Sequence, residues 1–195
     1  MAKTRLSHRI FFSFLAILFF ITAFSLSFLV IWQAHENDQS SSSNKTSQTL
    51  PTCSTTPPPA SVVNMAAPKG SKLEGTKLAD FTPCSVSSLK ALTVKVGTGQ
   101  EATSSSTVIV NYTGAVAATG VIFQSSLDTG QPASLSLSNV IPGWQQGIPG
   151  MKVGGSERLL IPADLAYGPN PPSGAGIPAN ADLVFDITLL DASST

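Results

Sequence analysis

Two aromatic residues stand beside glycines or in a turn, placements that are less typical of core side chains. Trp144 follows a Pro-Gly pair, and Tyr167 directly precedes a glycine. Both histidines precede Leu50 and both cysteines precede Ser85, so the C-terminal part of the chain has neither residue type. A zinc site, a cysteine–histidine nucleophile pair and a Ser-His-Asp triad are therefore excluded there. Any chemistry in that part must proceed without these groups.

The segment from residue 140 to 168 should position both aromatics. Pro142 suits the first turn of a helix, where its missing N–H is not needed. The glycines at 147, 150, 154 and 155 limit that helix to about two turns. Residues 157–162 alternate as a strand, with Leu159 and Ile161 on one face and Arg158 on the other. A turn over residues 163–168 then holds Tyr167.

Other short apolar stretches predict the remaining strands. Period-two patterns bounded by glycine, proline or polar turns mark residues 92–96, 107–115, 121–124, 133–137 and 182–190. Short strands with one short helix indicate an α+β domain.

Eight sequence blocks stand in the order and near the spacing of one known family. They are VNYTG (110–114), FQSS (123–126), VIPGW (140–144), G-x-x-GM-x-VGG (147–155), L-x-IP (159–162), AYG (166–168), GIPANA (176–181) and LVFD (183–186). Together they resemble the core signature of FKBP-type peptidyl-prolyl cis-trans isomerases, of a single-domain, membrane-anchored bacterial type. The resemblance covers roughly residues 91–191. It implies a twisted antiparallel β-sheet wrapped around one short α-helix.

This resemblance implies an enzyme that accelerates rotation about X–Pro bonds and assists protein folding. The rotation needs no nucleophile; its barrier of about 18–20 kcal/mol arises because amide resonance must be broken. An apolar cleft that fits the twisted amide better than the planar one lowers that barrier without a metal or a cofactor. In the family, the backbone N–H at the Ile141 position and the hydroxyl at the Tyr167 position bind carbonyl oxygens of the ligand.

The family's cleft can be carried over residue by residue. The implied catalytic residues are Tyr112, Phe123, Val140, Ile141, Trp144, Tyr167 and Phe185. The implied substrate-binding residues are Gln124, Ala133, Leu135 and Ile177. Proline-containing polypeptide segments, and macrolide immunosuppressants, are the ligands that follow.

Two positions depart from the family. Gln124 stands where an acidic residue is usual, and Ala133 replaces a common pocket aromatic. These departures favour an alternative hypothesis, a proline-peptide binding module with the same fold and little turnover. A surface scaffold in which the domain is only structural is a third hypothesis. Saturable binding without acceleration would identify the binding module.

The N-terminal part predicts a membrane anchor and a tether. Residues 1–9 are basic, and residues 10–32 are apolar and uncharged, long enough to cross about 30 Å of hydrocarbon. Basic residues before this stretch and acidic residues after it place the C-terminal domain outside the cytoplasmic membrane. A cleaved signal peptide is the alternative, but its apolar region is usually shorter. Residues 33–72 predict a disordered Ser/Thr/Pro-rich linker, and residues 73–195 the isomerase domain.

Three further properties follow from composition. The formal net charge is +0 and 11% of residues are charged, which gives no sign of nucleic-acid binding. No heptad pattern or exposed apolar helix argues for assembly, so we expect a monomer. Cys53 and Cys84 could form a disulfide in an oxidising compartment, or remain two free thiols because one lies in the linker.

Overall fold

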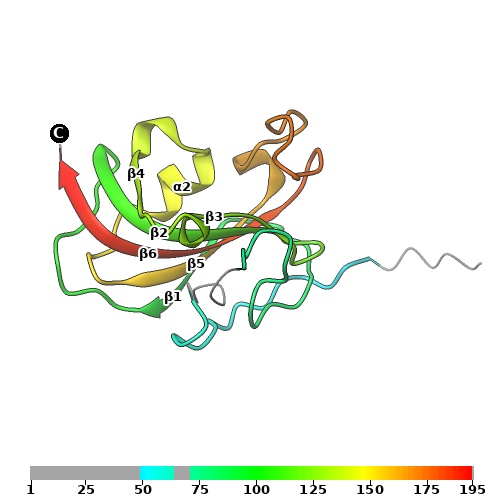
Figure 1. The fold of residues 1–195 in the computed structure, drawn as a ribbon, viewed down its shortest axis with the longest axis horizontal. Coiled ribbons are helices and arrows are strands. Elements are labelled where there is room, and N and C mark those ends of the chain that lie inside the picture. Colours follow the sequence, from blue (N-terminus) through cyan, green and yellow to red (C-terminus); the bar gives the residue numbers. More distant parts are fainter. Residues whose placement is uncertain (1–48, 64–70, 195) are drawn as a thin grey trace, which may run out of the picture. The chain divides into compact units, whose positions relative to one another are not determined.

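The computed structural model describes residues 49–63 and 71–194, which belong to one compact unit (Figure 1). The expected membrane anchor at residues 10–32 lies outside the described residues, as do residues 33–48 and 64–70 of the expected linker. Within the described ranges, no helix has both the length and the apolar character needed to span a bilayer.

A six-stranded antiparallel sheet forms the framework of this unit. Its strands run in the order β1-β5-β6-β2-β3, and β4 also pairs with β2. The strands are β1 (Lys90–Lys95), β2 (Ser106–Val116), β3 (Ile122–Ser125), β4 (Ala133–Ser136), β5 (Ser156–Ile161) and β6 (Leu183–Ser194). Short 3-10 turns occur at Ser126–Asp128, Leu137–Asn139 and Ala163–Leu165.

The predicted α+β fold is confirmed, and every expected strand is present within a few residues of its predicted ends. Strand β6 continues beyond its predicted end at residue 190, because it pairs with β2 from Val116↔Leu183 to Ser106↔Ser194. The apolar pattern of its last residues is too weak to show this extension, which backbone hydrogen bonds to the neighbouring strand support.

One α-helix, α2 (Pro142–Gly147), lies on the concave face of the sheet (Figure 1). Two glycines set how close it lies to β5. A Cβ atom added at Gly143 would lie 2.4 Å from Cγ2 of Ile161, and one added at Gly147 would lie 3.0 Å from Cδ1 of Leu159. The main core cluster fills this interface, with Trp144 and the fully buried Val108 and Val110 among its members.

The strap, residues 49–63, lies on the opposite face of the sheet, where Cys53 packs in a second core cluster with Leu160 and Val184. Cys53 forms a disulfide with Cys84, which settles the pairing that the sequence left open. Beside it, the Cys53 N–H donates to the Ser85 carbonyl at 3.0 Å, and the Ser85 N–H donates to the Pro51 carbonyl at 2.9 Å. Closing this loop, of sequence separation 31, contributes about 3–4 kcal/mol to the free energy of unfolding in the chain-entropy account.

For these residues, the structure differs from the predicted disordered linker. Few large apolar residues occur in the strap, and composition therefore indicated disorder. Its position instead depends on a covalent bond and on backbone hydrogen bonds to residues about thirty positions later, which no local pattern reveals.

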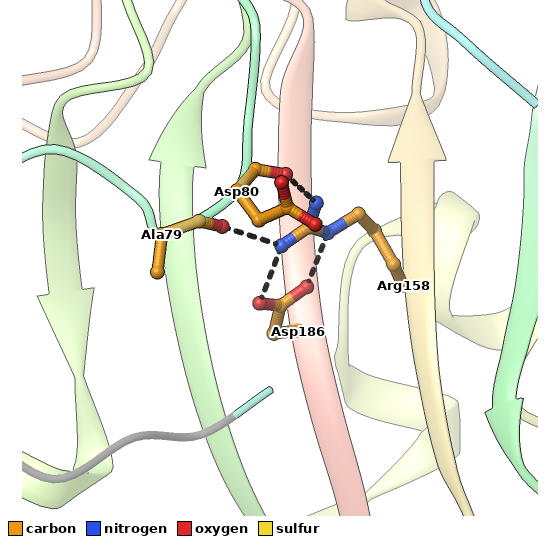
Figure 2. Close-up of polar contacts among 4 residues, drawn as sticks. All are labelled: Ala79, Asp80, Arg158 and Asp186. Atoms are coloured by element: carbon orange, nitrogen blue, oxygen red, sulfur yellow. Dashed lines mark hydrogen bonds and ion pairs between the residues drawn. The ribbon is translucent and has the colours of Figure 1, made fainter. Parts of the chain in front are cut away.

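A buried ion pair joins two central strands and fixes a third segment (Figure 2). Arg158 on β5 is the cross-strand partner of Asp186 on β6. Its Nε donates to Oδ1 of Asp186 at 2.6 Å and its Nη2 to Oδ2 at 2.9 Å. The same guanidinium donates to the carbonyls of Asp80 at 2.8 Å and Ala79 at 3.1 Å. It also lies 5.6 Å from the centroid of the Phe81 ring.

The guanidinium therefore ties residues 79–81 to the outer face of the sheet. The backbone of Asp80 has a φ of 48°, a left-handed conformation that non-glycine residues seldom adopt, and the bond from Arg158 holds its carbonyl in place. Burial raises the pKa of the Asp186 carboxyl, and the hydrogen bonds and charge of Arg158 oppose that shift. Two direct hydrogen bonds therefore hold the two charged groups together in a site that is shielded from solvent.

We expect Asp186→Ala to lower the free energy of unfolding by about 3–5 kcal/mol, because it leaves the buried guanidinium without its counter-charge. Urea unfolding followed by circular dichroism measures this loss. The double variant Arg158→Met/Asp186→Leu should recover part of it, since no charge is then buried. A single variant that unfolds at the wild-type urea concentration would contradict this account of the ion pair.

Candidate functional site

A cleft of about 340 Å³ opens on the concave face of the sheet, where the start of α2 meets β2, β3, β4 and β6. All nine residues that line it are uncharged. They are Tyr112, Gln124, Leu135, Asn139, Val140, Ile141, Trp144, Tyr167 and Phe185. The cleft can therefore bind a neutral, largely apolar group, with a few polar atoms to orient it.

Aromatic rings form one wall and the floor. The Trp144 ring lies 5.2 Å from the Phe185 ring and 5.6 Å from the Tyr112 ring, both in edge-to-face geometry. Trp144 is 4% exposed. The Phe123 ring supports Phe185 edge-on at 5.7 Å. Such edge-to-face pairs hold rings in fixed orientations, which keeps the floor rigid.

Gly114 makes this ring cluster possible. It lies on β2 opposite Phe185 of β6. A Cβ atom at this position would lie 2.6 Å from Cε1 of Phe185 and 2.7 Å from Cζ of Phe123. Only a residue without a side chain leaves room for both rings, which explains the glycine that follows Tyr112 and Thr113 in the sequence.

Helix α2 places Trp144 in the floor. Pro142 occupies the first turn, and the backbone N–H of Trp144 donates to the Ile141 carbonyl at 2.9 Å. The Ile141 N–H, by contrast, has no hydrogen-bond acceptor among the described residues. A free N–H just before a helix is suited to bind a carbonyl oxygen.

The two tyrosines add hydroxyl groups to the cleft. Neither hydroxyl makes a hydrogen bond to another described residue, so both can donate to a ligand. Burial raises the pKa of Tyr112, and the nearby Tyr167 raises it further. Burial also raises the pKa of Tyr167. Both phenols therefore remain protonated donors across the physiological pH range.

The structure brings together eight of the eleven residues that the sequence singled out. Phe123, Ala133 and Ile177 do not line the cleft. Phe123 lies behind Phe185, while Ala133 and Ile177 pack against the main core cluster. Their assignment as site residues was carried over from the resemblance, and for these three it stays a prediction.

Asn139 lines the cleft and was not among the predicted residues. It ends the 3-10 turn Leu137–Asn139, directly before the predicted Val140 and Ile141. That adjacency was the available signal, but the direction of a side chain at the end of a turn depends on the turn's geometry.

Among the described residues, no group of three or more histidine, cysteine, aspartate or glutamate side chains could hold a metal ion.

The chain resembles known proteins in sequence. A family described as FKBP-type peptidyl-prolyl cis-trans isomerase matches residues 98–190. A probable FK506-binding protein from Corynebacterium glutamicum is 48% identical over 98 residues, which cover 50% of this chain and 80% of that protein. The FKBP-type isomerase FkpA from Aeromonas hydrophila is 43% identical over 120 residues, which cover 61% of this chain but 41% of FkpA.

It also resembles a solved structure. The crystal structure of FkpA from Escherichia coli matches with a TM-score of 0.50 and 43% sequence identity, over 54% of this chain and 48% of that chain. This chain therefore spans less than half of the length of the FkpA proteins that it matches.

We expect the cleft phenols to ionise above their ordinary pKa of 10.0. The chain has two tyrosines and both line the cleft, so the ultraviolet absorbance of tyrosinate reports this site alone. The folded state holds the phenolic protons more tightly than the unfolded state. Its stability should therefore fall as the pH rises through 10 towards the folded-state pKa values. The same titration in denaturant is the control, and a folded-state midpoint at or below that of the denatured chain would refute the shift.

Proposed function

The chain belongs to the FKBP-type peptidyl-prolyl cis-trans isomerase family, and we propose that it accelerates rotation about X–Pro bonds in other polypeptides. The observation that carries this proposal is the uncharged cleft whose floor is Trp144. In it the Ile141 N–H and the Tyr167 hydroxyl have no hydrogen-bond partner within the described part of the chain. These groups are those needed to hold a proline ring and orient its flanking carbonyls.

The mechanism requires no covalent step. A planar amide is polar because resonance separates charge between its oxygen and nitrogen, and rotation removes that separation. Transfer from water into an apolar cleft therefore penalises the planar form more than the twisted one. Binding energy that favours the twisted amide lowers the barrier, which is about 18–20 kcal/mol in water.

Each cleft group has a role in this mechanism. The Trp144 indole supports the proline ring, and the rings of Tyr112 and Phe185 exclude water from its sides. The Ile141 N–H and the Tyr167 hydroxyl bind carbonyl oxygens on either side of the rotating bond. They fix both ends of the substrate while the amide between them turns.

One observation favours the alternative, a proline-peptide binding module with little turnover. Gln124 lines the cleft and supplies a neutral carboxamide where the family usually has an acid. A neutral cleft forms weaker hydrogen bonds to substrate N–H groups than one with a carboxylate. Binding without acceleration in the assay below would identify this module.

Macrolide immunosuppressants are proposed as competing ligands of the same cleft.

We expect the full-length chain, purified in a mild detergent, to accelerate isomerisation of a short X-Pro peptide. Tyr167→Phe should lower kcat/KM by about 2- to 10-fold, the effect of losing one neutral hydrogen bond. Trp144→Phe keeps an aromatic floor but reduces its area and should lower kcat/KM further. Lys95→Gln on β1, remote from the cleft, is the control. A folded chain that binds the peptide but does not accelerate its isomerisation would contradict the enzyme proposal.

The cleft is proposed to act outside the cytoplasmic membrane, tethered by residues 10–32. That stretch is apolar and uncharged, and basic residues precede it. The Cys53–Cys84 disulfide supports this location, because disulfides persist in oxidising compartments and are rare in the cytosol.

Protease added to intact spheroplasts should therefore digest the domain, while a cytoplasmic marker protein remains protected. The domain should stay with the membranes after an alkaline carbonate wash. Protection of the domain from protease would contradict the proposed side of the membrane. Release by the wash would instead favour a cleaved signal peptide.

A further inference from the structure

Gln145 on α2 makes a side-chain contact that the cleft itself does not explain. It is exposed and does not line the cleft. Its Nε2 donates to the Val140 carbonyl at 2.9 Å, and it lies 3.5 Å from the Ser138 carbonyl. Its backbone N–H also donates to the Ile141 carbonyl at 3.2 Å. One residue thus binds three carbonyls of the loop that forms a wall of the cleft.

The contact with Val140 matters because of the peptide group to which that oxygen belongs. The Val140 carbonyl and the Ile141 N–H are two ends of one planar unit. In a trans peptide they point in opposite directions, so a donor that holds the oxygen on the helix side directs the N–H away from it. Among the described residues, the Ile141 N–H has no hydrogen-bond acceptor, so it is available to a ligand.

No other described residue donates to the Val140 carbonyl. The neighbouring Ile141 carbonyl is held by two backbone N–H groups of α2, those of Trp144 and Gln145. The orientation of the peptide between Val140 and Ile141 therefore depends on one side chain. A hydrogen bond to its oxygen also polarises its N–H, which strengthens that N–H as a donor.

We propose that Gln145 is a positioning residue that aims and polarises the Ile141 N–H for binding a substrate carbonyl. This inference rests on the proposed isomerase function and adds to it a residue outside the cleft. Gln145 need not touch the substrate, since its effect passes through one peptide group.

The test compares Gln145→Ala with Gln146→Ala in the full-length chain. Gln146 is the adjacent exposed glutamine on the same helix, and its side chain makes no hydrogen bond to another described residue. We expect Gln145→Ala to lower kcat/KM by about 2- to 10-fold. It should also move the amide proton resonance of Ile141 upfield, because the N–H is less polarised. Gln146→Ala should change neither quantity.

A second variant, Gln145→Glu, separates donation from packing. A carboxylate of nearly the same shape accepts hydrogen bonds but cannot donate to a carbonyl, so activity should fall at neutral pH. When the pH falls through the ordinary pKa of glutamate, about 4.3, the protonated acid regains a donor and activity relative to wild type should recover. Exchange NMR measures isomerisation at each pH without a coupling protease.

Other ionisable groups near Gln145 could also change activity with pH, so the pH experiment needs controls for them. The turn Leu137–Asn139 that packs on α2 carries none, and β5, on which α2 packs, carries Glu157 on the helix-facing side. Burial raises the pKa of Glu157, which gives a background change with pH. Wild type and Gln146→Glu contain the same Glu157, and neither should show the recovery.

The outcomes of this experiment are distinct. Unchanged kcat/KM and an unchanged Ile141 resonance in Gln145→Ala would overturn the positioning role. A wild-type chain without isomerase activity would overturn the proposed function. In that case the affinity of each variant for a proline peptide still decides the role of Gln145, since weaker binding by Gln145→Ala alone would support it and equal binding would refute it.

Discussion

The close approach of α2 to β5 is the constraint on which the rest of the site depends. Because Gly143 and Gly147 have no side chains, the helix can lie directly on Ile161 and Leu159. This proximity buries Trp144 against the concave face of the sheet, where its ring packs edge-to-face with that of Phe185. A helix held farther out would leave a gap beneath the indole and a floor free to change orientation.

The sheet supplies the other half of the same arrangement. Strands β2 and β6 pair along their whole lengths, and Gly114 opposite Phe185 leaves the space into which two phenylalanine rings fit. The cleft is thus bounded by groups on the strands, by Trp144 of α2, by Tyr167 of the turn after residue 165 and by the loop before α2. That loop precedes α2 and carries the Ile141 N–H, so its geometry depends on individual hydrogen bonds rather than on a ladder.

Interactions on the opposite face hold the strap and residues 79–81 without touching the cleft. The Arg158–Asp186 pair satisfies carbonyls of residues 79 and 80, and the Cys53–Cys84 disulfide fastens the strap. Arg158 alternates along β5 with Leu159 and Ile161. One face of this strand therefore binds residues 79–81, and the other face packs against α2. The same strands therefore stabilise the face that binds residues 79–81 and position the cleft residues on the other face.

The sequence patterns by themselves determined the strands and the short helix, and the resemblance to a known family implied most of the cleft. The signals for the strands and the helix are local: alternation along β5, Pro142 at a helix start and glycines that end the helix act over a few residues. Only the tertiary structure decided the ordered strap, the absence of Phe123, Ala133 and Ile177 from the lining of the cleft, and the inclusion of Asn139. The same holds for the contact of Gln145 with Val140. These features depend on the direction of a side chain at a loop, or on contact with residues distant in the sequence, and neither leaves a periodic pattern in the chain.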